Sequence, residues 1–496
     1  MPAKRVLFLL HNLHRVNFVP LGIASLIAVL EQRGYAVHLA CPEKDDVDAE
    51  MASFQPDVVA FSMLTGSHNQ YIQTNQRLKA QFHFTAVFGG AHPTFFPEII
   101  EEQGVDAVCI GEGDTAFPEF LERLGTPEVV HTQNFWVKQD GIIYRNPVRP
   151  LIANLDELPM PNYDIFYASF ANLRNNPIKH FMVSRGCPYD CTYCFNHSYS
   201  EIYQGKGQRL RYKSPQYVIA EIQNVAGKSP LECIYFRDDI FICSKTWLDE
   251  FIPAFKRQVG LPFICQLRVE MINAEVIQRL ISAGCVSISL GVETGNETLR
   301  NEVLNRKMSN QQIKEACALL KQFHLPFCVN NMVGLPGETI ENINETLALT
   351  QSLRPSYSWF QIFQPYPRTR LSQYAIEMGL FDGDFDRVQQ SCHEKTALQF
   401  APQHQRMVNN AHKLFALAVE WPWLTRLIKA LIQARENKLF IVFFAVGQYY
   451  FTTSRLFPML KMTLGDWMRG FWNTILVTQP SYERSLRARK EVANGR

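Results

Sequence analysis

Short apolar runs alternate with helical segments twice along this chain of 496 residues. In the first stretch the runs have the length and composition of buried strands: RVLFLL, AVHLAC, DVVAFSM, TAVFGG and DAVCIGEG. Six further runs follow in the second stretch, again with helical segments between them. This alternation predicts βαβ units and parallel sheets, whose ligands bind beyond the carboxyl ends of the strands.

The pattern predicts an α/β protein with four parts. Residues 1–135 are expected to form a Rossmann-like domain around a doubly wound parallel sheet. Residues 136–176 form a connector, in which Asp140-Gly141 is typical of a hairpin turn. Residues 177–395 suit a partial (β/α)6 TIM-type barrel, with its working groups at the carboxyl ends of the strands. Residues 396–496 are expected to form a small, mostly helical C-terminal region.

Three cysteines stand close together at the start of the second stretch. Cys187, Cys191 and Cys194 lie in SRGCPYDCTYCFN, and the other nine cysteines are scattered singly. Three thiolates can hold a metal centre and leave one coordination position open for a substrate. Two simpler interpretations compete: a zinc site completed by His197, or three unrelated thiols. A single cluster, without a second pair of ligands, favours an iron–sulfur site.

This loop resembles the signature of the radical S-adenosylmethionine (SAM) enzymes. The resemblance implies that Cys187, Cys191 and Cys194 ligate a [4Fe-4S] cluster, whose fourth iron is chelated by SAM. It also implies a role in SAM binding for the aromatic residue before the last cysteine, Tyr193. Reduction of such a cluster cleaves SAM to methionine and a 5′-deoxyadenosyl radical. No catalytic side chain is predicted.

The ends of the later barrel strands carry residues that could complete a SAM pocket. The resemblance implies that Asp238 and Asp239 receive the SAM amino group and that Glu293 receives the ribose hydroxyls. It also implies that the turn at Gly334, in GLPGE, passes close to the adenine. The aspartates are equally suited to cap the next helix, and a lone glycine turn is a weak signal.

Arg268, on the third expected barrel strand, can hold a carboxylate with two parallel hydrogen bonds. The partner could be SAM, the substrate, or only Glu270 two positions further on. Lys307 matches a recurrent lysine of the family and is assigned no role.

The first stretch resembles cobalamin-binding Rossmann-like domains through two of their three motifs. Ser62 and Leu64 match an S-x-L motif, and Gly89-Gly90 match a G-G motif. The D-x-H-x-x-G loop, whose histidine binds cobalt, is absent. His11 or His14 could replace that histidine, although a polar loop histidine is more often structural. Gly89-Gly90 could equally be a turn that needs positive φ.

The composition is that of a globular protein: 47% of residues are hydrophobic, 19% are charged and the net charge is +2. The N-terminus is not a secretory signal. Twelve cysteines without disulfide spacing predict a reducing cytoplasmic location. The expected partners are a small-molecule substrate and a flavodoxin or ferredoxin-type electron donor, with no nucleic acid.

Residues 401–496 differ from the rest in charge and in aromatic content. They carry 14 Lys+Arg and 5 Asp+Glu, a net charge of +9, and four of the seven tryptophans: Trp421, Trp423, Trp467 and Trp472. The apolar segment that starts at Leu439 is shorter than the ~20 residues of a membrane-spanning helix. It is expected to be a buried or interfacial helix. The region could contact membrane lipid or an anionic substrate, or be a helical subdomain with a solvated basic face.

Three functions fit these features. The first is methylation of an unactivated carbon of a small molecule, for which a hydrophobic compound is one option, by a radical SAM enzyme with cobalamin. The second is an oxidative cyclase of the magnesium-protoporphyrin monomethyl ester type. The third is a non-enzymatic, zinc-stabilised cobalamin-binding module.

Overall fold

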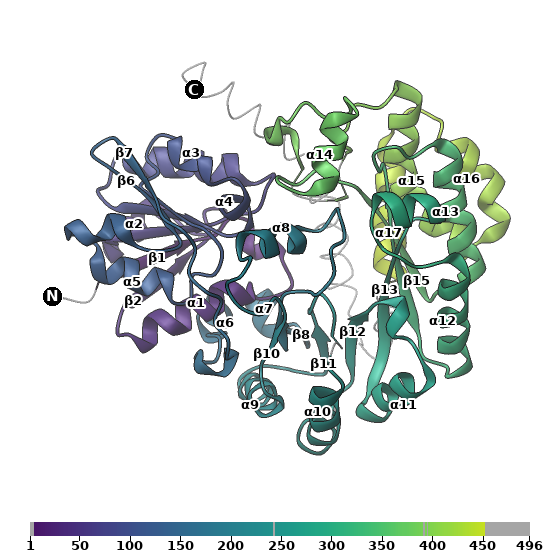
Figure 1. Ribbon diagram of the computed structural model, residues 1–496, viewed down its shortest axis with the longest axis horizontal. Coiled ribbons are helices and arrows are strands. Elements are labelled where there is room, and N and C mark those ends of the chain that lie inside the picture. The colour runs from purple at the N-terminus through teal and green to yellow at the C-terminus, as the bar shows by residue number, and fades with distance from the viewer. Residues whose placement is uncertain (1–3, 242–243, 390–391, 394, 452–496) are drawn as a thin grey trace. The chain divides into compact units, whose positions relative to one another are not determined.

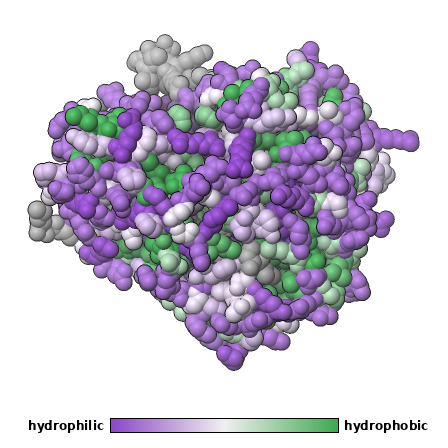
Figure 2. All heavy atoms as spheres, viewed as in Figure 1, coloured by the Kyte–Doolittle hydropathy of each residue, from purple (hydrophilic) through white to green (hydrophobic). Residues whose placement is uncertain are grey.

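A computed structural model describes residues 4–241, 244–389, 392–393 and 395–451 (Figure 1). Contacts between Cα atoms divide the chain into two compact units. The first contains residues 1–188 and 198–235, and the second contains residues 189–197 and 236–496. Hydrophilic residues cover most of the face drawn in Figure 2, with smaller hydrophobic areas between them.

A seven-stranded sheet forms the centre of the first unit, in the order β2-β1-β3-β4-β5-β6-β7. Its first five strands pair in parallel, which confirms the predicted Rossmann-like sheet. They are β1 (Arg5–Leu9), β2 (Ala36–Ala40), β3 (Val58–Ser62), β4 (Thr85–Gly89) and β5 (Ala107–Cys109). The helices that connect or follow them are α1 (Leu21–Gln32), α2 (Val47–Phe54), α3 (His68–Lys79), α4 (Ala91–Phe95) and α5 (Ala116–Arg123).

The predicted hairpin joins this sheet as its edge. β6 (Phe135–Gln139) pairs antiparallel with β5 and with β7 (Ile142–Arg145). Asp140 and Gly141 have φ of 51° and 78°, the left-handed pair that a two-residue type I′ turn requires. The hairpin therefore covers the edge of β5.

The segment before the cysteine loop differs from the single strand expected at HFMVSRG. The chain forms β8 (Ile178–Phe181) and then a separate β9 (Ser184–Arg185), which pairs antiparallel with β10 (Arg211–Tyr212). Gly186 follows β9 with φ of 89°, and a Cβ built there would lie 1.8 Å from the Arg209 carbonyl oxygen. This close approach between two backbones comes directly after β9, and only glycine fits it.

Two arginines of the β9–β10 ladder hold the loop that follows β5. Arg185 donates two hydrogen bonds to Asp114, over 2.8 and 3.0 Å. Arg211 donates two to Glu112, over 2.6 and 3.1 Å. Burial opposes the charge of Asp114, but the neighbouring Arg185 holds the pKa of that carboxyl below its usual value. The residues just before Cys187 are therefore fixed by buried ion pairs.

Six strands form the second large sheet, in the order β15-β14-β13-β12-β11-β8. Each strand lies beside the strand of this sheet that precedes it in the chain, as predicted for a partial barrel. They include β11 (Cys233–Phe236), β12 (Phe263–Leu267), β13 (Cys285–Glu293), β14 (Phe327–Val333) and β15 (Tyr357–Ile362). The main helices between and after them are α9 (Pro215–Ala226), α10 (Lys245–Gln258), α11 (Ala274–Ala283), α12 (Asn310–Gln322), α13 (Ile340–Leu353) and α14 (Arg370–Glu377).

The described part of the C-terminal region is helical, as expected: α15 (Pro402–Glu420), α16 (Thr425–Leu431) and α17 (Lys438–Phe451). α15 packs with α13 against β15, and Met407 and Val408 belong to the same buried cluster as Phe360 and Ile362 (Figure 1). Within residues 4–451, apart from the short gaps, no helix has the length and apolar character needed to cross a bilayer. Trp467 and Trp472 lie outside the described residues.

Candidate active site

A strained residue ends β13. Glu293 has φ of 70° at a bulge in the ladder between β13 and β14. This left-handed conformation is costly for a residue with a side chain, and such strain gathers at functional sites. The Glu293 carboxylate accepts a hydrogen bond from the Tyr193 hydroxyl over 2.9 Å and lies 3.4 Å from the Arg306 guanidinium. Two predicted SAM-binding residues, Tyr193 and Glu293, are thus in direct contact.

Arg306 connects this pair to the cysteine loop. Its guanidinium donates to the Tyr193 hydroxyl over 2.9 Å and to the Gly291 carbonyl over 2.5 Å, and it lies 3.9 Å from the Cys191 Sγ. Its Nε is buried and has no hydrogen-bond partner among the described residues. Burial opposes the charge, but Tyr193, Glu293 and Cys191 together hold the pKa of Arg306 above its usual value. The group is a fixed buried cation.

A second guanidinium lies on the same sulfur. Arg268 donates to the Cys191 Sγ over 3.3 Å and to Glu270 over 2.7 Å, and its guanidinium carbon stacks 3.8 Å from the centre of the Tyr189 ring. The expected structural partner, Glu270, is therefore present, and Cys191 is a further one. Hydrogen bonds and positive charge at a cysteine sulfur suit a thiolate ligand of an electron-rich cluster.

His197 is not placed to complete a zinc site. Its Nδ1 lies 3.0 Å from the Cys191 carbonyl oxygen, and its Nε2 accepts a hydrogen bond from the Arg370 backbone amide over 3.2 Å. Nε2 therefore acts as an acceptor, and Nδ1 carries the proton and donates to Cys191. Because both nitrogens are bonded to backbone, the interpretation as a Cys3His zinc site loses its fourth ligand.

The remaining residues predicted for the cluster and for SAM near the cysteine loop are Cys187, Cys194, Asp238 and Asp239. The Cys194 amide donates to the Cys191 carbonyl over 3.1 Å, and burial raises the pKa of the Cys194 thiol to about 11. Asn196 donates to the Cys194 Sγ over 3.5 Å and also hydrogen-bonds Asp239, whose pKa is raised by burial. Asp238 is fully buried. Cys187 is half-buried and belongs to the first unit.

The turn after β14 is held by a buried acid. Glu338 accepts hydrogen bonds from the amides of Gly334 and Leu335, over 2.6 and 3.3 Å. Burial raises the pKa of Glu338 to about 8. A Cβ at Gly334 would lie 2.8 Å from Val408 of α15, so the missing side chain lets this helix approach. The expected contact between Gly334 and adenine remains a prediction.

The predicted cobalamin residues lie at the carboxyl ends of β3 and β4. Met63 donates its amide to the Gly89 carbonyl, and a Cβ on Gly90 would lie 2.8 Å from the Met63 oxygen. Gly90 has φ of 96°, so a turn that needs positive φ is present here, as the sequence analysis allowed. Gly90 is exposed, Ser62 and Gly89 are partly exposed, and Leu64 is 54% exposed. A bare glycine beside an exposed apolar side chain fits a broad ligand with apolar faces.

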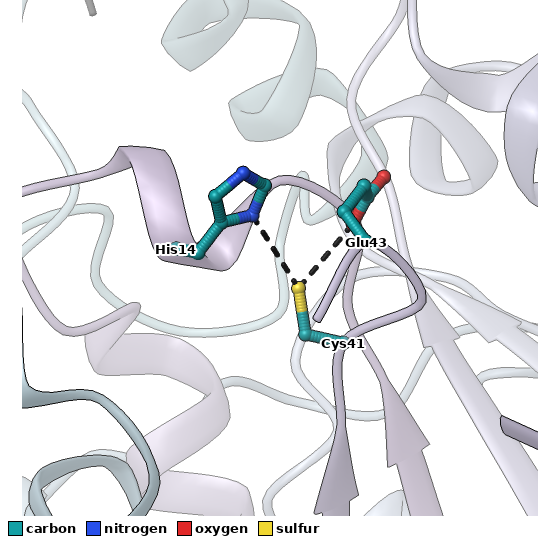
Figure 3. A group of neighbouring side chains, drawn as sticks. All are labelled: His14, Cys41 and Glu43. Atoms are coloured by element: carbon teal, nitrogen blue, oxygen red, sulfur yellow. Dashed lines mark hydrogen bonds between the residues drawn. The ribbon is translucent and has the colours of Figure 1, made fainter. Parts of the chain in front are cut away.

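The two histidines considered as cobalt ligands are already engaged. His11 lies 2.8 Å from Glu43 through Nδ1 and 3.0 Å from the Thr74 hydroxyl through Nε2. His14 lies 3.8 Å from the Cys41 Sγ through Nδ1 (Figure 3). Its Nε2 accepts a hydrogen bond from Arg15 over 3.1 Å. In this conformation both ring nitrogens of each histidine make hydrogen bonds within the protein.

Comparison with known proteins identifies both halves of the chain. A profile of the Radical SAM superfamily matches residues 181–350, and a profile of the B12 binding domain matches residues 15–121. The first match contains the cysteine loop, Arg306 and Glu293, and the second contains Leu64 and Gly90. The protein is a radical SAM enzyme. It belongs to the radical SAM enzymes that carry a cobalamin-binding domain, and its cofactors are a [4Fe-4S] cluster, SAM and cobalamin.

Relatives of both predicted enzyme types are similar over most of the chain. An uncharacterized methyltransferase of Pyrococcus horikoshii is 29% identical, covering 73% of this chain and 79% of that one. The cytidylyl-2-hydroxyethylphosphonate methyltransferase of Streptomyces wedmorensis is 25% identical, covering 75% and 80%. The anaerobic magnesium-protoporphyrin IX monomethyl ester cyclase of Rubrivivax gelatinosus is 24% identical, covering 74% and 69%.

A solved structure has a similar fold. The cobalamin-dependent SAM radical enzyme OxsB, with aqua-cobalamin bound, aligns with a TM-score of 0.63 at 14% identity, covering 100% of this chain and 81% of that one. The prediction of a Rossmann-like domain followed by a partial barrel is confirmed.

Sequence analysis missed Arg306. It lies beside Lys307, the residue that matches a recurrent lysine of the family, in a segment without strand or helix periodicity. The signal that could have revealed it is the run of basic residues Arg306-Lys307 shortly after the acidic strand end at Glu293.

Proposed function

We propose that this enzyme transfers a methyl group to an unactivated carbon of a small molecule with an apolar part. The conjunction of a radical SAM barrel with a B12-binding domain in one chain carries the proposal. When bound, the cluster and SAM supply a 5′-deoxyadenosyl radical that removes a hydrogen atom from the carbon, and cobalamin supplies the methyl group that takes its place. The names of two relatives, both methyltransferases, support methylation.

The three cysteines hold the cluster in this proposal. Cys191 and Cys194 lie one backbone turn apart, and Arg268 donates a charged hydrogen bond to the Cys191 Sγ. Cys187 provides the third thiolate. Asp238 and Asp239, at the end of β11, provide acceptors for the SAM ammonium group.

Glu293 and Arg306 bind opposite ends of SAM. The Glu293 carboxylate accepts from the ribose hydroxyls in addition to Tyr193. The buried Nε of Arg306, which has no partner among the described residues, is a donor for the SAM carboxylate. Tyr193, between the two, keeps carboxylate and guanidinium at a fixed separation.

The exposed surface formed by Ser62, Leu64, Gly89 and Gly90 receives cobalamin. Leu64 contributes apolar contact, and the two glycines leave room for a ring close to the backbone. Because His11 is held at Glu43 and His14 at Cys41, we propose that neither histidine binds cobalt. Two observations on the cobalamin-loaded protein would support this: a base-off absorption spectrum, and an electron paramagnetic resonance spectrum without the signature of a histidine ligand.

The test is anaerobic reconstitution with iron, sulfide and cobalamin, followed by SAM and a reductant. We expect 5′-deoxyadenosine from the wild type and none from Cys191→Ala. As a control, Cys317→Ser changes a buried thiol on α12 and should leave the yield unchanged. Equal yields from wild type and Cys191→Ala would contradict the radical SAM assignment of this loop.

Oxidative cyclisation is the second candidate, because a magnesium-protoporphyrin cyclase is similar over 74% of the chain. SAM labelled with deuterium in its methyl group separates the two. Methylation carries the label into the product, whereas cyclisation removes hydrogens from the substrate and leaves the label in methionine. An unlabelled, dehydrogenated product would favour the cyclase.

We further propose a flavodoxin or ferredoxin-type electron donor, and contact between the C-terminal helices and an anionic membrane surface. Apolar residues line one side of α17 at helical spacing: Leu439, Val442, Phe443, Val446 and Tyr450 are 38–65% exposed. Trp423 is 78% exposed, and the exposed basic residues Arg426, Arg435 and Lys438 lie in the same region. Apolar groups beside basic groups suit the interface of an anionic bilayer.

Vesicle binding tests this contact. Phe443→Glu should reduce partitioning to vesicles that contain anionic lipid, and Ile142→Glu, at an equally exposed apolar position on β7, should not. Removal of residues 401–496 is unsuitable, because α15 belongs to the core. Equal binding of Phe443→Glu and the wild type would contradict the proposal.

A further inference from the structure

Three side chains with metal-ligating atoms converge at one end of the first sheet. His14 lies in the short turn Leu13–Arg15 after β1, and Cys41 and Glu43 directly follow β2 (Figure 3). β1 and β2 pair up to Leu9 and Ala40, and the Leu10 amide continues the ladder to the Ala40 carbonyl over 3.0 Å. The backbone of two adjacent strands thus fixes the positions from which these side chains start.

The ligand atoms are close to the separations that a tetrahedral ion imposes. The Cys41 Sγ lies 3.8 Å from the His14 Nδ1 and 3.3 Å from the Glu43 Oε2, and all three ligand atoms lie within 4.8 Å of one another. Zinc bonds of about 2.3 Å to sulfur and about 2.0–2.2 Å to nitrogen or oxygen place tetrahedral ligands about 3.4–3.6 Å apart. Shifts of side chains alone would close the set.

The carboxylate is held in place by groups around it. Glu43 lies 2.8 Å from the His11 Nδ1 and accepts hydrogen bonds from the Asn12 amide over 2.9 Å and the Gln70 amide group over 3.0 Å. Partners of this kind orient the ligands of metal sites. Cys41 is fully buried, whereas the Glu43 side chain is 21% exposed, so the cluster reaches solvent on one side.

We propose that His14, Cys41 and Glu43 bind one Zn²⁺ ion, with water as the fourth ligand. One thiolate, one imidazole and one carboxylate form a borderline-soft set that suits zinc. The site is separate from the cluster cysteines and goes beyond the proposed methyl transfer. Binding releases the Cys41 thiol proton to solvent and changes no oxidation state.

Arg15 should weaken the binding of zinc at this site. A guanidinium always donates, so its bond to the His14 Nε2 leaves the imidazole proton on Nδ1. A zinc ion on Nδ1 moves that proton to Nε2 and displaces Arg15. Arg15 therefore competes with zinc both as a donor and as a positive charge, and Arg15→Ala should bind zinc about fivefold more tightly.

The test uses the full chain with its iron–sulfur cluster already assembled anaerobically, so that the cluster cysteines hold iron, and zinc as the only added ion. X-ray absorption at the zinc edge is blind to iron and should show one sulfur neighbour at about 2.3 Å. Cys41→Ser should remove this sulfur, and His14→Ala and Glu43→Gln should each weaken zinc retention against a chelator by about 10–100-fold. Cys317→Ser should change neither.

Several results would overturn the proposal. They are a zinc ion with three sulfur neighbours, a zinc ion with none, no zinc retained by the wild type, or equal retention by the wild type and Glu43→Gln. Glu43→Gln also serves as a test if Cys41→Ser fails to fold. The glutamine side chain has the same size, and its amide oxygen can still accept a hydrogen bond from the Asn12 amide. Weaker binding by Arg15→Ala would likewise count against a zinc site.

Discussion

The Tyr193 hydroxyl donates to the Glu293 carboxylate over 2.9 Å, across one hundred positions of sequence. Burial raises the pKa of Tyr193 well above its usual value, so the hydroxyl keeps the proton that it donates. Arg306 donates to the same hydroxyl, which makes an uninterrupted line of hydrogen bonds from guanidinium to carboxylate. The cysteine loop and the end of β13 are therefore joined through side chains.

Arg306→Gln should lower the free energy of unfolding by about 3–5 kcal/mol, because it leaves the buried Glu293 without its cation. Chemical denaturation of the protein measures the difference. Arg387→Gln removes a guanidinium that is 42% exposed beside Asp382 and should cost about 1 kcal/mol or less. Similar losses in the two variants would show that Glu293 does not depend on Arg306.

Arg268→Gln should lower the reduction potential of the assembled cluster. A positive charge 3.3 Å from the Cys191 Sγ favours the reduced, more negative form of the cluster, and its removal withdraws that stabilisation. A redox titration followed by electron paramagnetic resonance measures the midpoint. Arg279→Gln, which removes a cation of α11 that pairs with Asp249 of α10, provides the control. An unchanged or higher midpoint in Arg268→Gln would refute this electrostatic role.

Asp114→Asn should destabilise the protein by about 3 kcal/mol at neutral pH, since it removes a buried charge that pairs with the partly exposed Arg185. The folded-state pKa of Asp114 lies below its unfolded value, so the ion pair stabilises the protein above the unfolded pKa. This contribution is lost as the pH falls through the folded pKa. The wild type should thus approach the variant in acid.

Unfolding curves at several pH values test this convergence. Asp48→Asn, at an exposed pair with Arg77, serves for comparison and should cost about 1 kcal/mol or less. A stability gap between the wild type and Asp114→Asn that persists in strong acid would rule out the ion pair as its source.

Glu338 should make the protein less stable as the pH rises from about 4.5 to about 8. Its pKa is raised to about 8 in the folded chain, so over this range the folded state holds a proton that the unfolded state has released. Glu338→Gln mimics the protonated acid and removes this dependence. The measurement is the difference in unfolding free energy between the two proteins across the range, and a constant difference would show that Glu338 is ionised at neutral pH.

Much of the fold could be predicted from the sequence, because strands and turns are local. The run TAVFGG predicts a strand that the structure places at Thr85–Gly89, and Asp140-Gly141 predicts the hairpin turn that forms. The strand expected at HFMVSRG is divided in two, and its second part, Ser184–Arg185, pairs with the distant strand Arg211–Tyr212. No pattern within the segment itself contains that information.

For the candidate site, the sequence allowed individual residues to be predicted but not the contacts between them. The spacing of the cysteines identifies the loop, and Glu293 follows from its place at a strand end. Their connection through Arg306 arises from side-chain contacts between positions more than a hundred residues apart. The engagement of His197 by the Arg370 amide is equally non-local, and for this reason the zinc interpretation could not be excluded from sequence.

The strand order of the second sheet has a consequence for biosynthesis. From β12 to β15 each strand pairs with the one made just before it, so each can dock as soon as it leaves the ribosome. The short loop closures keep the entropic cost of each addition low. By contrast, β3 pairs with β1 and not with β2, the strand made just before it, so one edge of β1 stays open until β3 is made. Early in synthesis, the aggregation risk of this chain lies in its first sixty residues.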